Sequence, residues 1–330
     1  MKILITGITG FVGSHLADFF LKEFSEFEIH GTKRYHLSRT DNIQHIYEKL
    51  TWHDCNLLEH ISVDTLIETL KPDIIFHMAA ESFVSPSWQH PQHYMNANYG
   101  MTVNLLEAIK KHSPDTIIHI PGSGEEYGDI HEDKLPITNQ TLLNPVNPYA
   151  VTKIAQDLIG CVYHRSFGTK VIRTRAFNHE GPRRHFVFGI PSYAWQIARI
   201  EGGLQDPIIE TGDVDDQRNF TDVRDMVYAY WLATQHCEPG RLYLVGQDDP
   251  EMVMTFRQAL DKLIDISFVE KEKLSVLQVD KFTRPTKVPF LISDVSEFKE
   301  VTGWNRKYDL DDILGDTLNY WRDRVSRGVY

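Results

Sequence analysis

The 330-residue sequence has little cysteine, no long hydrophobic run and no excess of basic residues. Its three cysteines, Cys55, Cys161 and Cys237, lie far apart and form no CxxC pair, so we expect a reducing compartment rather than a disulfide framework. No stretch reaches the roughly 18 apolar residues that a membrane span requires. We therefore expect a cytoplasmic protein with no membrane partner.

The balance of charge argues against a second class of partner. The chain has 34 Lys and Arg against 46 Asp and Glu, a formal net charge of -12. A uniformly acidic surface repels phosphate backbones, so general nucleic-acid binding is not expected. Sixteen histidines are present, but the best ligand-like spacing, "HPQH" at 90–93, has neither HExxH nor paired cysteines beside it. We predict no metal site.

The first half of the sequence alternates strand-like and helix-like segments. Continuous apolar runs predict strands, and helical periodicity predicts the helices between them. Such alternation is typical of βαβ units, in which both faces of a parallel sheet are buried. We predict an α/β, Rossmann-type, doubly wound parallel sheet, with strands at 2–6, 27–32, 73–80, 115–120 and 170–177 and helices at 11–24, 63–70, 93–112 and 148–167.

The second half is less regular and contains no internal repeat. A basic, loop-like segment at 178–189 precedes a predicted helix at 220–235, a strand at 241–246 and a final helix near 309–327. We expect a smaller C-terminal substrate-binding lobe, with part of the chain returning to the sheet. The predicted boundaries are 1–177 plus about 212–246 for the domain that contains the sheet, and 178–211 plus 247–330 for the lobe.

The segment "TGITGFVG" places Gly7, Gly10 and Gly13 between the first strand and the first helix. A dinucleotide site needs glycine for a tight turn, for close approach of a pyrophosphate and for packing of the helix on the sheet. The helix N-terminus then offers free N–H groups to the phosphates. The position of the motif predicts such a site, the alternative being a turn that only eases packing.

The second predicted strand ends in "HGTKRY", where NAD enzymes place a carboxylate for the ribose 2′-hydroxyl. Lys33 and Arg34 occupy this place, with Arg39 nearby. Cations suit a 2′-phosphate, so the sequence favours NADP as the cofactor. NAD bound by backbone groups beside a solvated basic edge stays an alternative.

The segment "NPYAVTK" puts Tyr149 and Lys153 four residues apart, on one face of a predicted helix. A tyrosine of pKa about 10 becomes a base at neutral pH only if about 4 kcal/mol favours its phenolate. An ammonium about 4 Å away supplies that energy at an effective dielectric constant near 20. Ser123, in the loop after the strand at 115–120, would hold the substrate oxygen beside Tyr149 while a nicotinamide takes the hydride.

The order TGxxGFxG, "HMAAES", "GSGEEYG", YxxxK and "RPTKV" resembles the extended short-chain dehydrogenase/reductase family of nucleotide-sugar enzymes over essentially the whole chain. The segments "FNHEGPRR", "GDVDDQRNFTDVRD" and "RPTKVPFL" are most similar to the GDP-mannose 4,6-dehydratases and the GDP-4-keto-6-deoxymannose reductases of that family. The resemblance implies a GDP-linked sugar as substrate and a homodimer or homotetramer.

The resemblance also assigns individual positions. It implies that Asn56 accepts a bond from the adenine amine in place of the usual Asp, and that Arg183 and Arg184 contact a neighbouring subunit or the cofactor, or are solvated. Implied substrate contacts are Ser82, Asn178, Arg218 and Arg284, with the last two clamping the diphosphate. Implied cofactor contacts are Gly7, Thr9, Gly10, Phe11, Val12, Gly13, Lys33, Arg34, Asn56, Leu57, Ala79, Ala80, Tyr149 and Lys153.

Glu125 stands where the dehydratases of the family have the glutamate that removes the C5 proton. The implied reaction oxidises the sugar at C4, eliminates water across C5 and C6 and returns the hydride to C6. The alternative role for Glu125 is that of a loop carboxylate bound by backbone N–H groups, and we expect its neighbour Glu126 to be solvated.

Besides Asn56, the chain departs from the family pattern at three positions. Ser123 replaces Thr, Lys287 replaces an acidic residue, and Gly124 replaces a polar side chain that helps the C6 hydroxyl leave. A reductase or a C4 epimerase on the same scaffold therefore stays an alternative. From another class, a catalytically silent dinucleotide-binding regulator is the third hypothesis.

Overall fold

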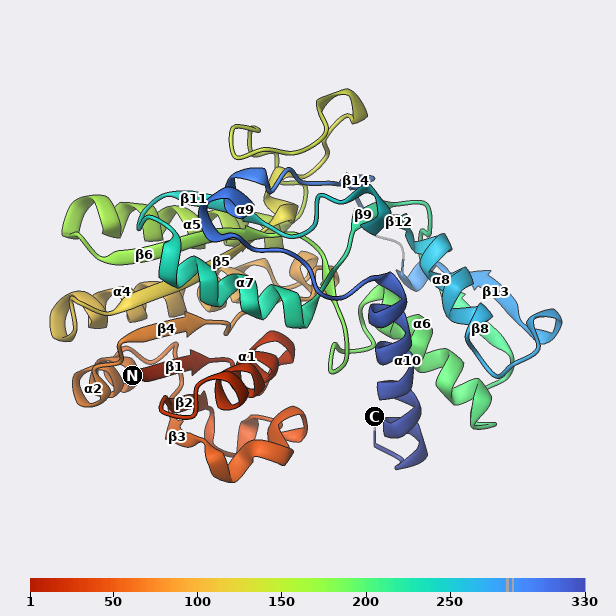
Figure 1. Cartoon of the computed structure of the whole chain (residues 1–330), viewed down its shortest axis with the longest axis horizontal. Coiled ribbons are helices and arrows are strands. Elements are labelled where there is room, and N and C mark those ends of the chain that lie inside the picture. Colours follow the sequence, from red (N-terminus) through yellow and green to blue (C-terminus); the bar gives the residue numbers. More distant parts are fainter. Residues whose placement is uncertain (283–284, 287, 330) are drawn as a thin grey trace.

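The framework of the protein is one seven-stranded sheet (Figure 1). The structure, a computed structural model, describes residues 1–282, 285–286 and 288–329. The strand order is β11-β6-β5-β4-β1-β2-β3, and each neighbouring pair is parallel. This confirms the predicted parallel α/β sheet. The strands are β1 (Lys2–Thr6), β2 (Glu28–Lys33), β3 (Thr51–Asp54), β4 (Ile74–His77), β5 (Ile117–Ser123), β6 (Lys170–Ala176) and β11 (Leu242–Val245).

Helices bury both faces of the sheet, which explains why its central strands are apolar at consecutive positions. In β1, Ile3 and Ile5 point to one face, covered by α1 (Phe11–Glu23) and α7 (Val223–His236). Leu4 points to the other face, covered by α2 (His60–Leu70), α4 (Met101–His112) and α5 (Pro148–Phe167). No helix among the described residues is long and apolar enough to cross a membrane.

A second core lies to the right of the sheet in Figure 1. Three helices form it, α6 (Gly189–Glu201), α8 (Phe256–Asp265) and α10 (Leu310–Ser326), together with the parallel pair β8 (Ile208–Thr211) and β13 (Ser275–Gln278). It buries apolar side chains from all three helices, including Ile197, Leu263 and Leu314. The domain boundaries proposed above stay a prediction.

Five short strands of the described chain lie in the segments that connect the two cores, and one helix returns the chain to the sheet. The short strands are β7 (His179–Glu180) with β10 (Thr221–Asp222), and β9 (Gln217–Asn219) with β12 (Val253–Thr255) and β14 (Phe290–Leu291). The chain then returns to the sheet, because α9 (Ser296–Thr302) packs against α7 and β11. Phe298 and Trp304 accordingly belong to the core under the sheet.

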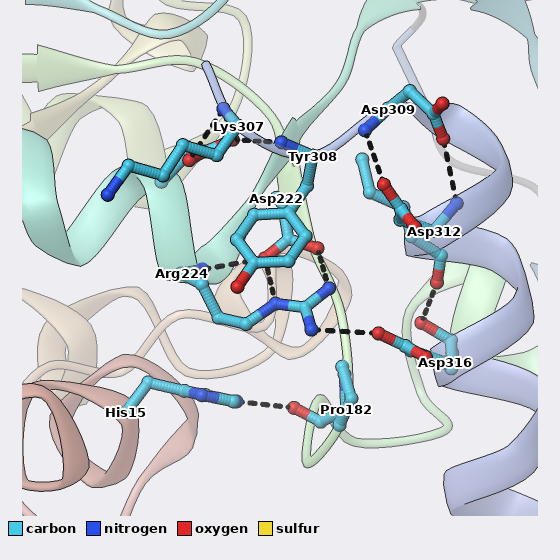
Figure 2. Close-up of polar contacts among 12 residues, drawn as sticks. His15, Pro182, Asp222, Arg224, Lys307, Tyr308, Asp309, Asp312 and Asp316 are labelled. Carbon is cyan, nitrogen blue, oxygen red and sulfur yellow. Dashed lines mark hydrogen bonds and ion pairs between the residues drawn. The ribbon is translucent and has the colours of Figure 1, made fainter. Parts of the chain in front are cut away.

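Arg224, in the first turn of α7, joins α7 to α10 (Figure 2). Its guanidinium pairs with Asp222 at 2.7 Å and with Asp316 of α10 at 2.8 Å, and it lies 3.6 Å from the centre of the Tyr308 ring. Below Arg224 in Figure 2, the ring of His15 in α1 hydrogen-bonds the carbonyl oxygen of Pro182 at 2.9 Å. The segment after β6 is thus held against the helix that follows the glycine turn.

Most predicted elements of the first half are present, and the differences have local causes. The helix expected at 93–112 is divided into α3 (Pro91–Met95), a π-helical turn (Asn96–Gly100) and α4. Strand β3 was not predicted from its pattern, because "TWHD" at the sheet edge has only one strongly apolar residue. In the second half, helices α6 and α8 were not predicted from the sequence.

Candidate active site

The glycine turn after β1 has the geometry that a dinucleotide site requires. Gly7 adopts a φ of +66°, and a Cβ there would lie 2.7 Å from the backbone nitrogen of Ala79. A Cβ on Gly13 would lie 2.4 Å from the carbonyl oxygen of Gly7. A side chain at either position would therefore collide with backbone, so both glycines are needed for the turn to pack under β4 and α1.

The N-terminus of α1 is arranged to receive an anion. Its N-cap, Gly10, provides no side-chain hydrogen bond, and the first turn contains no acidic residue. The first backbone N–H groups of a helix lack intrahelical acceptors, and the helix dipole favours negative charge there. This end of α1 fits the diphosphate of a dinucleotide.

The end of β2 is partly engaged by the protein itself. The Lys33 ammonium donates to the Tyr47 hydroxyl at 3.2 Å and lies 3.8 Å from the Asp54 carboxylate. Arg34 is exposed, and Arg39 pairs with Asp41 at 2.7 Å. Lys33 and Arg39 are thus engaged by other side chains of the protein, whereas Arg34 is exposed to solvent, where a 2′-phosphate could reach it.

Other predicted cofactor contacts surround the same strand ends. Thr9, Phe11 and Val12 belong to the turn and the first turn of α1, and Leu57 is buried beside β3. Asn56 is exposed, and its side-chain oxygen already accepts the N–H of Leu58 at 3.2 Å. After β4, the N–H of Ala79 donates to Thr6 at 3.3 Å, and Ala80 is exposed.

Ser123 is the last residue of β5 and begins a 3-10 turn over Gly124–Tyr127. Its hydroxyl accepts the N–H of Glu125 at 3.2 Å, and it lies close enough to Tyr149 to lower the pKa of that phenol. Ser123 and Tyr149 thus lie on the same side of the site, and their joint action on a substrate hydroxyl stays a prediction. The turn sits at the carboxyl end of a central strand, where open α/β sheets bind ligands.

Tyr149 occupies the first turn of α5 and is buried. Burial raises the pKa of its phenol far above 10, whereas the hydrogen bond from Ser123 lowers it. The carboxylates of Glu125 and Glu126 raise the pKa of Tyr149 further, and Arg184 lowers it. Arg184 is thus a cation whose charge acts on this phenol, which the sequence did not indicate.

Lys153 lies one helical turn after Tyr149 and is also buried. Its ammonium donates to the carbonyl oxygen of Pro121 at 2.6 Å and to the side chain of Gln156. Burial lowers the pKa of Lys153 to about 8, and the nearby Glu126 and Asp157 oppose this shift. In this arrangement two donors of Lys153 point into the protein, so its predicted action on Tyr149 stays a prediction.

Glu125 is held by a residue that the sequence did not single out. The side-chain nitrogen of Asn147 donates to the Glu125 carboxylate at 2.9 Å, and the Asn147 oxygen caps α5 by accepting the N–H of Ala150 at 2.8 Å. The signal was present in "NPYA", because Asn followed by Pro is typical of a helix N-terminus. The Glu125 carboxylate is therefore oriented by the N-cap residue of α5, two positions before Tyr149.

The expectation for Glu126 was wrong. Its side chain is 0% exposed and forms an ion pair with Arg175 of β6 at 2.7 Å. The sequence suggested a solvated carboxylate because the residue lies in a polar turn, but the turn folds back over β6 and encloses it. Burial raises the pKa of Glu126 to about 7, and Arg175 opposes this rise.

The predicted substrate contacts are spread over several segments. Asn178 follows β6, and its carbonyl oxygen accepts the N–H of Thr221 at 3.0 Å, whereas Ser82 is exposed after β4. Arg218 of β9 is buried and donates to the carbonyl oxygens of Gln217 and Pro289 at 2.8 and 3.3 Å. Arg284 and Lys287 lie outside the described residues.

The two arginines of "GPRR" are both engaged. Arg183 pairs with Asp18 of α1 at 2.6 Å. The Arg184 guanidinium lies 4.3 Å from the centre of the Phe188 ring and 5.6 Å from that of Phe11, and it hydrogen-bonds the carbonyl oxygen of His179. Because Phe11 begins α1, Arg184 lies beside the N-terminus of the helix that follows the glycine turn.

Comparisons with known proteins agree with this geometry. The model of a family described as GDP-mannose 4,6 dehydratase matches residues 4–317. GDP-6-deoxy-D-mannose reductase from Pseudomonas aeruginosa is 29% identical over 326 residues, with 98% of each chain covered. GDP-mannose 4,6-dehydratase from Yersinia enterocolitica is 28% identical, with 96% of this chain and 92% of that protein covered. The solved structure of RMD from Pseudomonas aeruginosa complexed with NADPH has a TM-score of 0.83 and 30% identity, with 98% of this chain and 99% of that chain covered.

Proposed function

Since this chain belongs to the GDP-mannose 4,6 dehydratase family, one of the short-chain dehydrogenase/reductase type, we propose that it is an NADP-dependent 4,6-dehydratase of a GDP-linked sugar. The observation that supports this most directly is that the turn of Ser123 and Glu125 at the carboxyl end of β5 is bonded through Asn147 to the N-terminus of α5, whose first turn carries Tyr149. An alcohol oxidation needs the hydroxyl and the phenol, and an elimination next to the new ketone needs the carboxylate.

The turn of Gly7, Gly10 and Gly13 would hold the diphosphate of NADP, and Arg34 would face the 2′-phosphate. NAD suits the same turn and is the alternative cofactor. When bound, the nicotinamide supplies a hydride acceptor for C4 and the source of the hydride that returns to C6. The cofactor ends each turnover in the state in which it began, so the enzyme needs no second substrate to restore it.

Tyr149 takes the proton of the C4 hydroxyl, and Ser123 orients that hydroxyl by a hydrogen bond. Because burial raises the pKa of Tyr149, a nearby cation is needed to favour the phenolate. Lys153 has three ammonium hydrogens, of which the contacts with Pro121 and Gln156 use two. We propose that the third serves the Tyr149 oxygen or a ribose hydroxyl.

Glu125 acts after C4 has become a ketone. The ketone acidifies the C5 hydrogen, and the Glu125 carboxylate, oriented by Asn147, removes it as a proton. The C6 hydroxyl then leaves as water with the proton that Glu125 carries. When the hydride returns to C6, C5 takes up a proton, and this uptake balances the proton that Tyr149 removed from the C4 hydroxyl. A positioned general base is worth about 10²–10⁴ in rate.

The test is incubation of the purified protein with GDP-mannose without added nicotinamide cofactor beyond one equivalent. A 4-keto-6-deoxy product at many turnovers is expected, and Tyr149→Phe should abolish it. Absence of product from GDP, dTDP, UDP and CDP sugars alike would reject the proposal. Light scattering on the same sample tests the oligomer, which we propose to be a homodimer or homotetramer.

A 4-keto sugar reductase is the second candidate, and Gly124 favours it. This residue offers no side chain to protonate a leaving C6 hydroxyl, and a Cβ there would lie 3.1 Å from the Phe177 ring. A reductase protonates only the C4 oxygen, which Tyr149 already serves. Stoichiometric NADPH oxidation on a GDP-4-keto-6-deoxy sugar would identify it. Inversion at C4 without dehydration would instead identify an epimerase, and a regulator would keep its behaviour in Tyr149→Phe.

A further inference from the structure

Glu126 has no part in the chemistry above, yet it forms a buried ion pair with Arg175. One carboxylate oxygen accepts the backbone N–H of Ser123 at 2.7 Å, and the other lies 2.7 Å from Nε of Arg175. Burying a carboxylate is unfavourable even after relaxation, so such a group persists only where its partners are well placed. The arrangement therefore points to a role for Glu126 at this position.

The backbone leaves room for this carboxylate. Gly122 lies in β5 next to the Glu126 carboxylate. A Cβ on Gly122 would be 2.4 Å from one of the carboxylate oxygens. The same Cβ would be 3.0 Å from the carbonyl oxygen of Thr174. A glycine is thus required at 122 for Glu126 to reach Arg175, and both features belong to one site.

The ion pair is part of a larger group of buried charges behind the catalytic residues. Arg175 also pairs with Asp157 at 2.7 Å and donates to the hydroxyl of Tyr127 at 2.9 Å. Asp157 pairs in turn with Arg173 at 2.6 Å. Because Asp157 lies one helical turn after Lys153 in α5, this group extends from β6 to the helix that holds Tyr149 and Lys153.

On the basis of the proposed function, we propose that Glu126 is a positioning residue, which fixes the turn presenting Ser123 and Glu125 and, in its ionised form, supplies a negative charge beside Tyr149 and Lys153. It touches neither substrate nor cofactor. Its action on the reaction goes through the orientation of the turn and through the protonation of the two residues of α5.

The geometric part of the role follows from a reciprocal pair of bonds. The Glu126 side chain accepts the N–H of Ser123, and the Ser123 side chain accepts the N–H of Glu125. Such a capping box closes one short turn on itself. With Glu126 anchored inward on Arg175, the neighbouring Glu125 side chain is directed to Asn147 and the open side of the site.

The electrostatic part involves every charged group that faces Tyr149. Burial raises the pKa of Tyr149, the Ser123 hydrogen bond lowers it, Glu125 and Glu126 raise it, and Arg184 lowers it. The phenol of Tyr230, on α7, faces the same group, and burial raises its own pKa well above 10. Loss of the Glu126 charge must therefore lower the pKa of Tyr149.

The groups that face Lys153 give the same sign. Burial lowers the pKa of Lys153 to about 8, while Glu126 and Asp157 raise it. Two buried histidines lie near, and burial, followed by the charge of Lys153, lowers the pKa of each to about 3, so His77 and His119 stay neutral at working pH. Without Glu126, the positive Arg175 would be less compensated and Lys153 would lose its proton at lower pH.

The test is Glu126→Gln, which keeps the size of the side chain and an acceptor for the Ser123 N–H but removes the charge. The rising limb of the pH profile of kcat follows the loss of the proton from Tyr149, and the falling limb follows its loss from Lys153. We expect both limbs to move to lower pH, by about one unit. Glu132→Gln removes an exposed carboxylate of the following loop and should leave both limbs in place. A purely structural Glu126 would change the height of the profile and not its position, and that result would overturn the proposal.

A second variant guards against loss of folding. Glu126→Gln with Arg175→Met removes both charges of the pair, and replacing a buried pair as a whole is often neutral for stability. Because the net charge near α5 is then unchanged, both limbs should return towards their wild-type positions. Limbs that stay as displaced as in the single variant would contradict the electrostatic role.

A titration without turnover separates this proposal from the proposed function. The near-ultraviolet absorbance of phenolate, taken as wild type minus Tyr149→Phe in the NADP-loaded protein, follows Tyr149 alone. The same difference in the Glu126→Gln background should show Tyr149 losing its proton about one pH unit earlier. An unshifted titration rejects the role of Glu126 even if no sugar substrate is turned over.

Discussion

The side-chain amide of Asn147 caps helix α5 with its oxygen and orients the Glu125 carboxylate with its nitrogen, at 2.8 and 2.9 Å. One residue thus ties the helix of Tyr149 to the turn of Glu125. Because the two bonds use different atoms of one amide, substitutions can remove them separately.

Asn147→Ser should keep the helix cap and lose the bond to Glu125. Serine is about as good an N-cap as asparagine, so we expect the free energy of unfolding to change by less than about 0.5 kcal/mol. Turnover should fall roughly tenfold or more, because Glu125 is no longer held beside C5. Denaturant unfolding and steady-state kinetics measure the two effects.

Asn147→Ala serves as the matched comparison, since it loses both bonds and should cost about 1 kcal/mol of stability. Equal turnover in Asn147→Ser and the wild type would mean that Glu125 needs no partner at Asn147.

Arg184→Gln should shift the pH profile in the direction opposite to Glu126→Gln. Arg184 lowers the pKa of Tyr149, so its removal raises that pKa. The rising limb of kcat, which depends on the phenolate, should move to higher pH by about half a unit. Kinetics between about pH 6 and pH 10 will locate the limb.

Arg183→Gln is the control, because Arg183 pairs with Asp18 on the outer side of α1. If both variants displaced the limb equally, a general loss of positive charge, and not the position of Arg184, would explain the shift.

The elements that the sequence predicted well are those with local start and stop signals. Helix α5 spans Pro148–Phe167 as predicted, since Asn147 and Pro148 start it and Gly168, with a φ of +73°, ends it. The glycine turn was equally accessible, because its spacing directly follows an apolar strand and opens a helix.

What the sequence could not predict depends on residues distant along the chain. Glu126 and Arg175 are separated by 49 positions, and nothing local distinguishes this glutamate from a solvated one. The approach of Arg184 to Phe11 likewise depends on how the segment after β6 folds against α1. Charge pairs of this kind become visible only when the sheet and its loops are assembled.

Arg224→Met should cost much more stability than Asp316→Asn, although both break the joint between α7 and α10 (Figure 2). Arg224 compensates Asp222, which is fully buried, so its loss leaves an unpaired carboxylate and should cost about 3 kcal/mol. Asp316 is substantially exposed, and its loss should cost less than about 1 kcal/mol. Denaturant unfolding of the two variants will compare them, and equal losses would mean that the Asp222 pair contributes nothing beyond the joint itself.

A glycine-to-alanine substitution in each of two helices tests whether the glycine turn binds the cofactor. In α1, Gly13→Ala places a methyl group 2.4 Å from the carbonyl oxygen of Gly7, so the turn must open. We expect a loss of about 1–3 kcal/mol, as for other overpacked sites, together with at least a tenfold weaker affinity for NADP. In α10, a Cβ on Gly315 meets nothing within 4 Å among the described residues, so Gly315→Ala should raise stability by up to about 1 kcal/mol and leave NADP affinity unchanged. Calorimetric titration with NADP decides the matter, because an unchanged affinity in Gly13→Ala would place the cofactor away from the N-terminus of α1.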